Sequence, residues 1–282
     1  MARCLSAREL LNDNMRCFFT ILLLLCGVDA WSQRSFDVAF CDVENLYDTM
    51  PSSFYDDSDY TPQGRLRWDT ARYRHKVESV ARLLDSMAMP VVALWGVENE
   101  QVVRDIVMAS KSYYAYVHRT HDYSDGLDFA LLYYGDRFFP EHVTSWRGAL
   151  CVEGRADGHK VAIVVNHRST SLKVLLTERG LLEGKKVVIV LGTPSKSDLR
   201  SFGLQDHTLA SESAGRGNMV RGNGWIMRDR IASTWGGKVH CDVYAARWLI
   251  DELGTPRATY VGNRYYGGVG AYLPIFAQFF HY

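Results

Sequence analysis

Charged and polar side chains stand beside apolar runs at several places in this sequence. A loop held by a rigid scaffold can aim a side chain, so catalytic and binding residues concentrate where strands meet loops. The last such place reads GGVGAYLPIF, residues 267–276, and its turn presents Gly270, Ala271 and Tyr272. This turn could be the rim of an active site, or of a site that has lost its chemistry. The segments with this character are 41–48, 94–100, 125–134, 165–170, 190–198, 228–233 and 267–275.

Two residue clusters suggest binding chemistry by themselves. Asp122, Asp125 and Asp128 are spaced closely enough to hold Ca²⁺. Their loop lacks the glycine and the closing Glu of an EF-hand, so a solvated acidic loop is the favoured interpretation. Arg216 and Arg221 lie in a Gly-rich stretch where they could bind phosphate, although a flexible loop is favoured there too.

The composition is that of a globular chain. Its 282 residues are 47% hydrophobic and include 32 basic and 32 acidic side chains, which gives no formal net charge. This length supplies ample core for one large domain or two small ones. Because non-specific nucleic-acid binding depends on neutralising phosphates, the balanced charge argues against it and leaves room only for a local basic groove.

The N-terminus has the pattern of a secretory signal peptide. Met15 is the predicted true start, and one basic residue, Arg16, precedes an apolar run over residues 17–26. Small residues follow at Ala30 and Ser32, where cleavage is expected. A run of about ten apolar residues is too short to span a bilayer but suits a signal-peptide core.

Export follows from that pattern. Residues 1–32 are expected to be a signal peptide, and residues 33–282 a mature chain in the periplasm or outside the cell, without a transmembrane span. A buried N-terminal helix is the alternative interpretation. Lipoprotein anchoring through Cys26 is not expected, because Leu25 is a poor residue before a lipidated cysteine.

Three cysteines remain after such cleavage: Cys41, Cys151 and Cys241. An odd number in an exported chain does not make a disulfide framework. Either one disulfide bridge or three buried thiols would be consistent with this number. The spacing of the three cysteines fits no metal site.

Hydrophobic periodicity predicts more strands than helices. One helix is expected over residues 70–87, with an apolar face made of Tyr73, Val77, Val80, Ala81 and Leu84. A second helix is expected over residues 101–110. Continuous apolar strands need cover on both faces, which favours two packed sheets with helices outside them, in a single domain over residues 33–282. The predicted strands include 36–41, 91–95, 113–118, 127–134, 149–154, 160–167, 185–192 and 273–280.

In order and spacing, the strand-end segments resemble the endonuclease/exonuclease/phosphatase superfamily of magnesium-dependent phosphoesterases, closest to its deoxyribonuclease-like, exported bacterial branch. The resemblance covers about residues 36–280. Its most specific part is the ordered series VENLYD, DDSDYTPQG and RYRHKVESVARLL in the N-terminal half. It implies an α/β (α+β) fold, a four-layer αββα sandwich of two mixed sheets with outer helices. It also implies Mg²⁺ chemistry, in which carboxylates hold the metal and a His helps to activate water.

The resemblance places the metal ligands at positions that have changed. Asp42 stands where the family usually has an Asn that helps to hold the metal, and Asp could still bind Mg²⁺. Gly96 occupies the position of the main metal ligand, a Glu. Glu98 remains two residues further on, where the family has a Glu that is not the main ligand. Asp42 and Glu98 are therefore the candidate metal ligands, and Asp42 and Glu44 are alternatively turn or capping acids.

The other motifs of the family are also altered. His167 matches the phosphate-contacting His, and Asp229 matches the Asp that steers the final His, so both would be vestiges of the catalytic set. The alternative interpretations are structural: His167 would be a polar residue with its hydrogen bonds made, and Asp229 would be part of a surface salt bridge. At other motif positions the residue that the family usually has is replaced. Asp125 stands in place of an Arg, and Thr193 and Ser195 stand in place of the Asp and Asn of the signature. Ala271 and Tyr272 stand in place of the final Asp and His.

These losses predict an exported pseudoenzyme that serves as a binding or scaffold module. Mg²⁺, the cofactor of the family, would not be retained. The partner is left open between a phosphate-containing ligand and another protein. The alternative is a divergent Mg²⁺-dependent nuclease or phosphatase with a metal site rebuilt from Asp42, Glu44 and Glu98.

Overall fold

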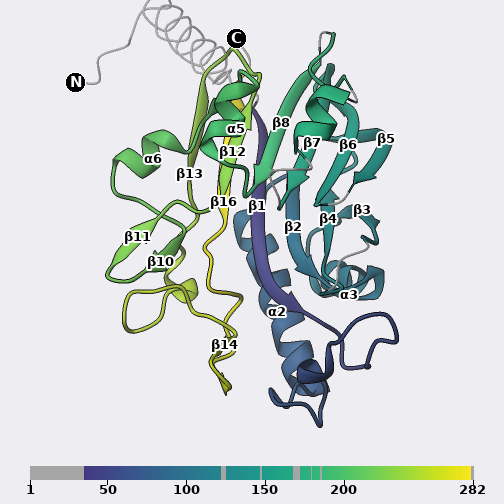
Figure 1. The fold of residues 1–282 in the computed structure, drawn as a ribbon, viewed down its shortest axis with the longest axis vertical. Helices are drawn as coiled ribbons and strands as arrows, with labels where there is room; N and C mark the ends of the chain where they lie inside the picture. Colours follow the sequence, from purple (N-terminus) through teal and green to yellow (C-terminus); the bar gives the residue numbers. More distant parts are fainter. Residues whose placement is uncertain are drawn as a thin grey trace, which may run out of the picture. The chain divides into compact units, whose positions relative to one another are not determined.

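Two six-stranded sheets dominate the computed structural model of this chain (Figure 1). The structure describes residues 35–121, 125–146, 148–167, 172–178, 180–184 and 186–280. The expected signal peptide, residues 1–32, lies outside these ranges. Within them, no helix combines the length and apolar character needed to cross a membrane.

The first sheet has the strand order β13-β16-β1-β2-β4-β3. Its long central strand, β1, pairs in parallel with β2 and antiparallel with β16, and the remaining pairs are antiparallel. This order brings the two ends of the described chain together in one sheet. The bounds are β1 Ser35–Leu46, β2 Val91–Val97, β3 Ala115–Arg119, β4 Asp128–Tyr133, β13 Val239–Val243 and β16 Ile275–Phe280.

The second sheet has the strand order β5-β6-β7-β8-β12-β9. Its one parallel pair is β7 with β8, so both sheets are mixed. The bounds are β5 Phe139–Trp146, β6 Ala149–Ala156, β7 His159–Asn166, β8 Val187–Gly192, β9 Gln205–Asp206 and β12 Arg230–Ser233.

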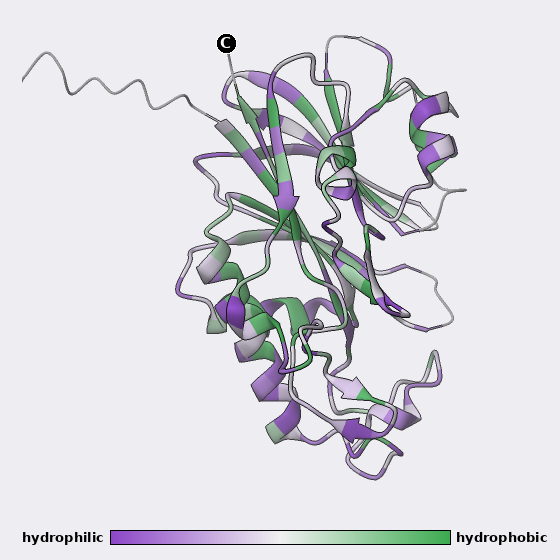
Figure 2. Ribbon diagram, turned by 90° about the vertical axis from the view of Figure 1, so that its left-hand side faces the viewer, coloured by the Kyte–Doolittle hydropathy of each residue, from purple (hydrophilic) through white to green (hydrophobic). Residues whose placement is uncertain are grey.

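The main core lies between the sheets, and alternation along the strands explains why. In β1, Val38 and Phe40 belong to the buried cluster shared with the second sheet, whereas Ala39 and Cys41 belong to the cluster under the outer helices. Successive strand residues point to opposite faces, so a strand covered on both sides must be apolar throughout. Figure 2 shows the hydrophobic colour concentrated on the strands. The predicted sandwich is confirmed.

Helices α2 (Thr70–Met87) and α3 (Glu100–Ala109) cover the outer face of the first sheet. The Asp69 side chain caps α2 by accepting a hydrogen bond from the Arg72 amide, and Ala88 ends the helix in the left-handed conformation. Such caps satisfy backbone groups that a helix end leaves unpaired. The helix predicted over residues 70–87 is therefore confirmed at both ends.

The outer layer on the second sheet is shorter. It consists of a π-helical turn, η2 (Val174–Glu178), and helix α5 (Lys196–Ser201), and it buries a group of leucines against that sheet: Leu172, Leu175, Leu176, Leu181 and Leu199. The cysteines Cys41, Cys151 and Cys241 are free and buried. Of the two possibilities that the sequence left open, three buried thiols are thus the one observed.

The last third of the chain contributes short elements. The stretch with Arg216 and Arg221, interpreted from its sequence as a flexible loop, instead forms a hairpin of β10 (Met219–Arg221) and β11 (Gly224–Ile226). Gly222, with a φ of 60°, supplies the turn that an L-residue would resist. The remaining elements are η1 Ser58–Tyr60, α6 Leu209–Ser213, η3 Arg247–Leu249, β14 Tyr260–Val261 and β15 Arg264–Tyr265.

Candidate functional site

The guanidinium of Arg228 lies between two buried carboxylates. Its Nη1 atom donates a 2.7 Å hydrogen bond to Oδ2 of Asp42 and lies 3.2 Å from Oδ1 of Asp229. Its central carbon lies 3.8 Å from the centre of the Tyr272 ring. The Arg228 side chain is 21% exposed, whereas those of Asp42 and Asp229 are 4% and 1% exposed. One cation thus holds together three segments that are remote in sequence.

A backbone irregularity in β1 positions Asp42. Asp42 pairs with Trp95 of β2, but the register then shifts before Leu46. Glu44 and Asn45 within the shift have φ angles of 48° and 51°. The Asp42 Oδ1 atom accepts a 3.0 Å hydrogen bond from the Glu44 amide, which closes the turn. This arrangement leaves Oδ2 for Arg228.

Asn218 fixes Asp229 and the backbone of Arg228 together. Its side-chain nitrogen donates a 2.6 Å hydrogen bond to Oδ2 of Asp229, and its side-chain oxygen accepts a 2.9 Å bond from the Arg228 amide. Asn218 is fully buried, and its role had no signal in the sequence. Burial raises the pKa of Asp229, and the nearby Arg228 opposes that rise. Asp229 does form a salt bridge, with Arg228, but its expected surface location is wrong because its side chain is only 1% exposed.

A third acid, Glu44, and a buried lysine, Lys76, lie close to Asp42. Glu44 Oε2 accepts a 3.0 Å hydrogen bond from the amide of Ala271, and Lys76 of α2 donates to the Glu44 carbonyl. Burial lowers the pKa of Lys76 to about 8, although Glu44 and Asp42 favour its charged form. A Cβ atom on Gly270 would lie 3.2 Å from that of Glu44, so the closing turn packs directly on the end of β1.

Gly96, the position of the expected main metal ligand, has no room for a relaxed side chain. Its φ is +91°, and a Cβ atom there would lie 3.3 Å from the amide nitrogens of Glu44 and Asn45. L-residues avoid this backbone conformation. The backbone at position 96 therefore suits glycine.

Glu98, the other candidate metal ligand, anchors a loop. Its Oε2 accepts a 2.6 Å hydrogen bond from the Asp48 amide, and its Oε1 accepts a 2.7 Å bond from the Tyr55 hydroxyl. Burial raises the pKa of Glu98 to about 7. Both oxygens are engaged by residues 48–55, whereas those of Asp42 are engaged by Glu44 and Arg228.

His167 stacks on Trp95, with ring centroids 4.2 Å apart and an interplanar angle of 18°. It follows β7 of the second sheet, whereas Trp95 belongs to β2 of the first, so the stack joins the sheets at one end. The hydroxyl of Thr193 donates a 2.6 Å hydrogen bond to the His167 carbonyl. Ser195 caps α5 by accepting a bond from the amide of Asp198. Thr193 and Ser195, which the resemblance places at the signature, thus stabilise a strand end and a helix end.

The DGLD segment, residues 125–128, also makes structural contacts. The Asp125 carbonyl accepts a 2.6 Å hydrogen bond from the Tyr47 hydroxyl. The Asp128 carboxylate is buried, with its Oδ2 3.1 Å from Nε2 of His118 and its Oδ1 2.7 Å from the amide nitrogen of His121. The Ca²⁺ interpretation included Asp122, which lies outside the described residues. Asp128 itself is enclosed by these two histidine residues.

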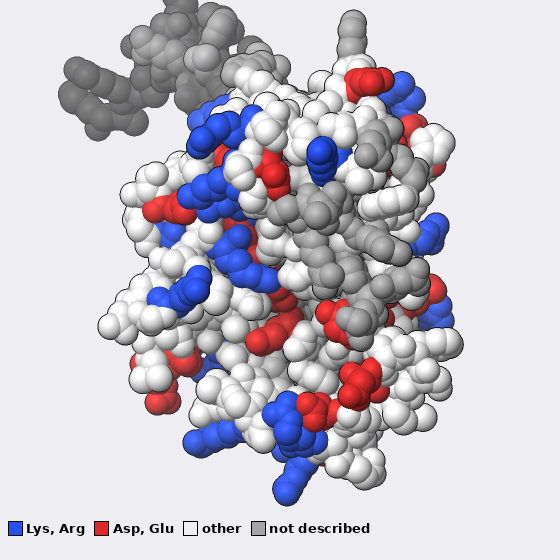
Figure 3. All heavy atoms as spheres, in the orientation of Figure 1, with Lys and Arg blue, Asp and Glu red and all other residues white. Residues whose placement is uncertain are grey.

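The arrangement does not fit a Mg²⁺ site. Mg²⁺ needs carboxylate oxygens that are free to coordinate it, together with water or phosphate. Here a guanidinium occupies the open oxygen of Asp42, and the oxygens of Glu98 bind a loop. In the ranges that the structure describes, no three His, Cys, Asp or Glu side chains gather as metal ligands. Figure 3 shows a group of basic side chains in the upper part of one face, above acidic side chains near its middle.

The two packed sheets and their outer helices together define a layered sandwich. The sequence model of the Endonuclease/Exonuclease/phosphatase family matches residues 37–173, so this part of the chain is similar to that family. No curated protein sequence matches the chain significantly. The solved structures agree with the fold at low sequence identity.

Three solved structures illustrate this agreement. A humanised TDP2 from D. rerio is 14% identical, with a TM-score of 0.57 over 88% of this chain and 99% of its own. A family protein from Bacteroides thetaiotaomicron is 15% identical, with a TM-score of 0.58 over 88% of this chain and 96% of its own. The mannosyl-6-phosphatase Bt3783 of the same organism is 14% identical, with a TM-score of 0.58 over 87% of this chain and all of its own.

Proposed function

We propose that this protein is an exported pseudoenzyme of the superfamily, in which the sandwich serves as a binding or scaffold module. The observation that carries the proposal is the position of Arg228. Its guanidinium contacts the carboxylate of Asp42 and lies beside that of Asp229, the residue matched to the Asp that steers the final His.

The physical argument concerns charge. A metal ion in a phosphoesterase supplies several kcal/mol of charge stabilisation to the transition state, to order of magnitude. A guanidinium compensates the same carboxylates in the folded state but binds no water as a Lewis acid does. A positioned acid or base contributes typically ~10²–10⁴-fold in rate. At the final motif, Ala271 and Tyr272 replace the Asp and His of the family, so that contribution is removed as well.

The rival proposal is a divergent Mg²⁺-dependent phosphoesterase with Asp42, Glu44 and Glu98 as ligands. It requires Arg228 to leave Asp42, and Glu98 to release the Asp48 amide and the Tyr55 hydroxyl. The observed hydrogen bonds favour the pseudoenzyme, because the carboxylates of Asp42, Glu44 and Glu98 already accept hydrogen bonds from the protein.

An activity assay separates the two proposals. The purified protein is incubated with Mg²⁺ or Mn²⁺ and either single-stranded DNA or a phosphomonoester, and Mn²⁺ binding is measured by calorimetry. We expect neither turnover nor saturable binding. Metal-dependent turnover that is lost in Asp42→Asn and kept in Asp37→Asn, a change in the same strand, would overturn the pseudoenzyme proposal.

Export is a separate part of the proposal, and it depends on the sequence pattern from Met15 to Ser32. The full chain with a C-terminal tag is expressed in a bacterium, and the N-terminus of the tagged product is sequenced. We expect the product outside the cytoplasm, beginning near residue 31 or 33. An intact N-terminus on a cytoplasmic product would contradict export without affecting the proposal about Arg228.

A further inference from the structure

A cavity of about 370 Å³ borders α2 and shares no lining residue with the contacts of the Arg228 centre. Its walls come from α2, from η3 and from the segment that precedes the closing turn. The lining residues are His75, Ser79, Arg82, Trp248, Leu249, Arg257, Tyr266, Gly267, Gly268 and Val269. The set includes two arginines and a histidine but neither Asp nor Glu.

We propose that this cavity binds a small organic anion with two negative charges and a flat apolar body, such as an aromatic phosphate ester or dicarboxylate. The proposal concerns a site separate from the Arg228 centre. A test of this cavity neither supports nor contradicts the pseudoenzyme proposal.

The two arginines are available for a ligand. The Arg82 guanidinium lies 4.4 Å over the Trp248 ring, a contact that orients it and leaves its N–H groups free to donate. Among the described residues, neither Arg82 nor Arg257 forms an ion pair with a carboxylate. The planar fork of a guanidinium matches the oxygens of a carboxylate or phosphate. Two such forks facing one cavity favour a doubly charged oxyanion.

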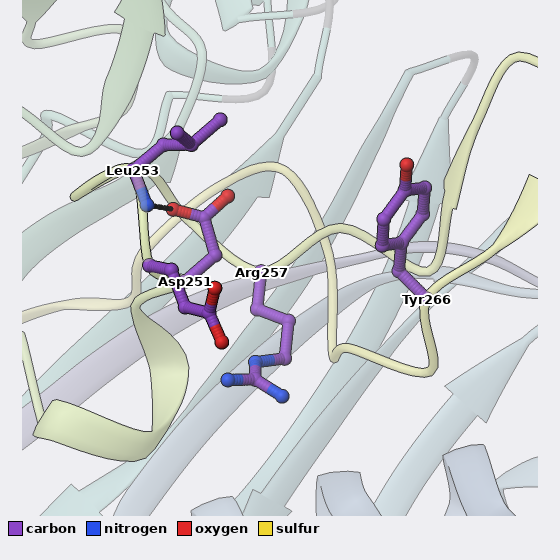
Figure 4. A pocket seen from close by; sticks show the side chains of 5 residues that line it. Asp251, Leu253, Arg257 and Tyr266 are labelled. Carbon is purple, nitrogen blue, oxygen red and sulfur yellow. Dashed lines mark hydrogen bonds between the residues drawn. The ribbon is translucent and has the colours of Figure 1, made fainter.

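Asp251 lies beside Arg257, with which it interacts electrostatically without forming an ion pair, and its carboxylate is held by its own loop. Asp251 accepts hydrogen bonds from the amides of Leu253 and Thr255 and from the Thr255 hydroxyl. It lines a second, adjoining cavity of about 340 Å³ that shares Arg257 and Tyr266 with the first. Figure 4 shows the Arg257 side chain between Asp251 and Tyr266 in this view. Arg257 therefore stands between an acidic loop on one side and the acid-free cavity on the other.

The double glycine before the closing turn builds the cavity wall. A Cβ atom on Gly268 would lie 1.7 Å from the Arg257 carbonyl oxygen, and one on Gly267 would lie 2.9 Å from the His75 ring. Only glycines allow this approach. The Arg257 amide also donates a 2.8 Å hydrogen bond to the Leu249 carbonyl. The backbone that carries Arg257 is thus held in place before any ligand arrives, which lowers the cost of binding.

Apolar and neutral groups complete the site. Leu249 and Val269 are buried at the cavity wall, and Trp248 offers an aromatic surface. Ser79 adds a hydroxyl, and the His75 ring is held by a 2.9 Å contact between its Nδ1 and the Tyr265 hydroxyl. Pockets of this kind combine an apolar lining with a few polar groups that orient the ligand. The wall is of mixed polarity, so an aromatic anion would place its ring against Trp248, Leu249 and Val269 and its oxyanion against the arginines.

Calorimetric titration with phenyl phosphate and with phthalate tests the proposal, and the tighter of the two identifies the type of oxyanion. We expect saturable binding at one site. Binding should weaken about tenfold or more in Arg82→Gln and in Arg257→Gln, because each loses a charge-assisted hydrogen bond. Arg74→Gln is the matched control, since Arg74 is exposed on the same helix but does not line the cavity.

Three results would overturn the proposal. The first is no saturable binding of either anion at millimolar concentration. The second is unchanged binding in the double variant Arg82→Gln/Arg257→Gln, which would place the anion elsewhere. The third is an equal loss in Arg74→Gln, which would indicate a general effect of charge. Melting curves of all variants verify that each is folded, and both substituted arginines are exposed, so we expect melting temperatures close to that of the parent protein.

Discussion

The guanidinium of Arg228 stacks 3.8 Å from the centre of the Tyr272 ring, at the position where the superfamily has its final His. The same guanidinium bonds to Asp42 and lies beside Asp229. An aromatic face attracts a cation, and the two carboxylates attract it further. Tyr272 and Arg228 are therefore parts of one arrangement that neutralises a buried acidic centre.

Removal of Arg228 is predicted to destabilise the protein. Arg228→Ala leaves Asp42 and Asp229 buried without their cation, and breaking such a pair is costly. Because Arg228 is partly exposed, we expect the free energy of unfolding to fall by about 2–4 kcal/mol. Urea denaturation measures the change.

The matched control for that variant is Arg221→Ala in the exposed hairpin. We expect a change below about 0.5 kcal/mol there. Equal, small losses in both variants would show that Arg228 makes no stabilising contact with the two acids. Arg228→Lys should recover part of the loss, because it keeps the charge without the flat surface that covers Tyr272.

Glu98 is predicted to make stability depend on pH. Burial raises its pKa to about 7, above the ~4.3 of an unfolded glutamate. Between these pH values the folded chain keeps a proton that the unfolded chain has released. The contribution of Glu98 to stability is therefore complete below about pH 4 and is lost as the pH rises to about 7.

Urea denaturation between pH 4.5 and 7.5 measures this dependence. Glu98→Gln should flatten the decline in the free energy of unfolding, whereas Glu78→Gln, a change at an exposed site on α2, should leave it in place. A decline that is just as steep in Glu98→Gln would assign it to other groups.

Restoring the family's Glu at position 96 is predicted not to restore metal binding. Gly96→Glu places an L-residue at a φ of +91° against two backbone nitrogens. We expect a loss of about 1–3 kcal/mol in the free energy of unfolding, as for other strained backbone sites. Calorimetry should detect no Mn²⁺ binding while Arg228 is present. Tight Mn²⁺ binding by this single variant would show that the centre still accepts a metal.

Gly268→Ala is predicted to be poorly tolerated. The new methyl group would overlap the Arg257 carbonyl at 1.7 Å, and overpacking of this kind costs roughly 1–3 kcal/mol or more. Gly236→Ala is the control, because a Cβ atom there meets no atom within 4 Å and the backbone is not left-handed. Melting temperatures of the two variants report the difference. A normal melting temperature for Gly268→Ala would contradict the close packing of these two segments.

Much of the fold was predictable from the sequence because its signals are local. The apolar face that predicted α2 lies within one short segment of the chain. Continuous apolar strands such as β2 and β8 require cover on both faces, so two sheets with outer layers follow from them. The pairing of β1 with β16 joins segments that are far apart in sequence, so no local signal predicts it.

The candidate site was predictable only in part. The changed positions Gly96, Ala271 and Tyr272 could be identified from their motifs. Asn218 and Lys76 gave no signal, because each acts through contacts with residues far along the chain. Glu98 was expected near a metal, but the structure ties its carboxylate to the 48–55 loop. A side chain's partners depend on tertiary packing, and neither spacing nor residue type specifies them.

The sequence by itself determined the layers of this protein and the absence of several family side chains, because hydrophobic periodicity and residue identity are properties of the chain. Only the tertiary structure decided what occupies the centre. Arg228 is adjacent to Asp229 in sequence, but its contacts with Asp42 and Tyr272 depend on how two sheets and a closing turn meet. Likewise, the need for glycine at positions 267 and 268 comes from their close approach to His75 and Arg257, which are remote in sequence or held by other loops.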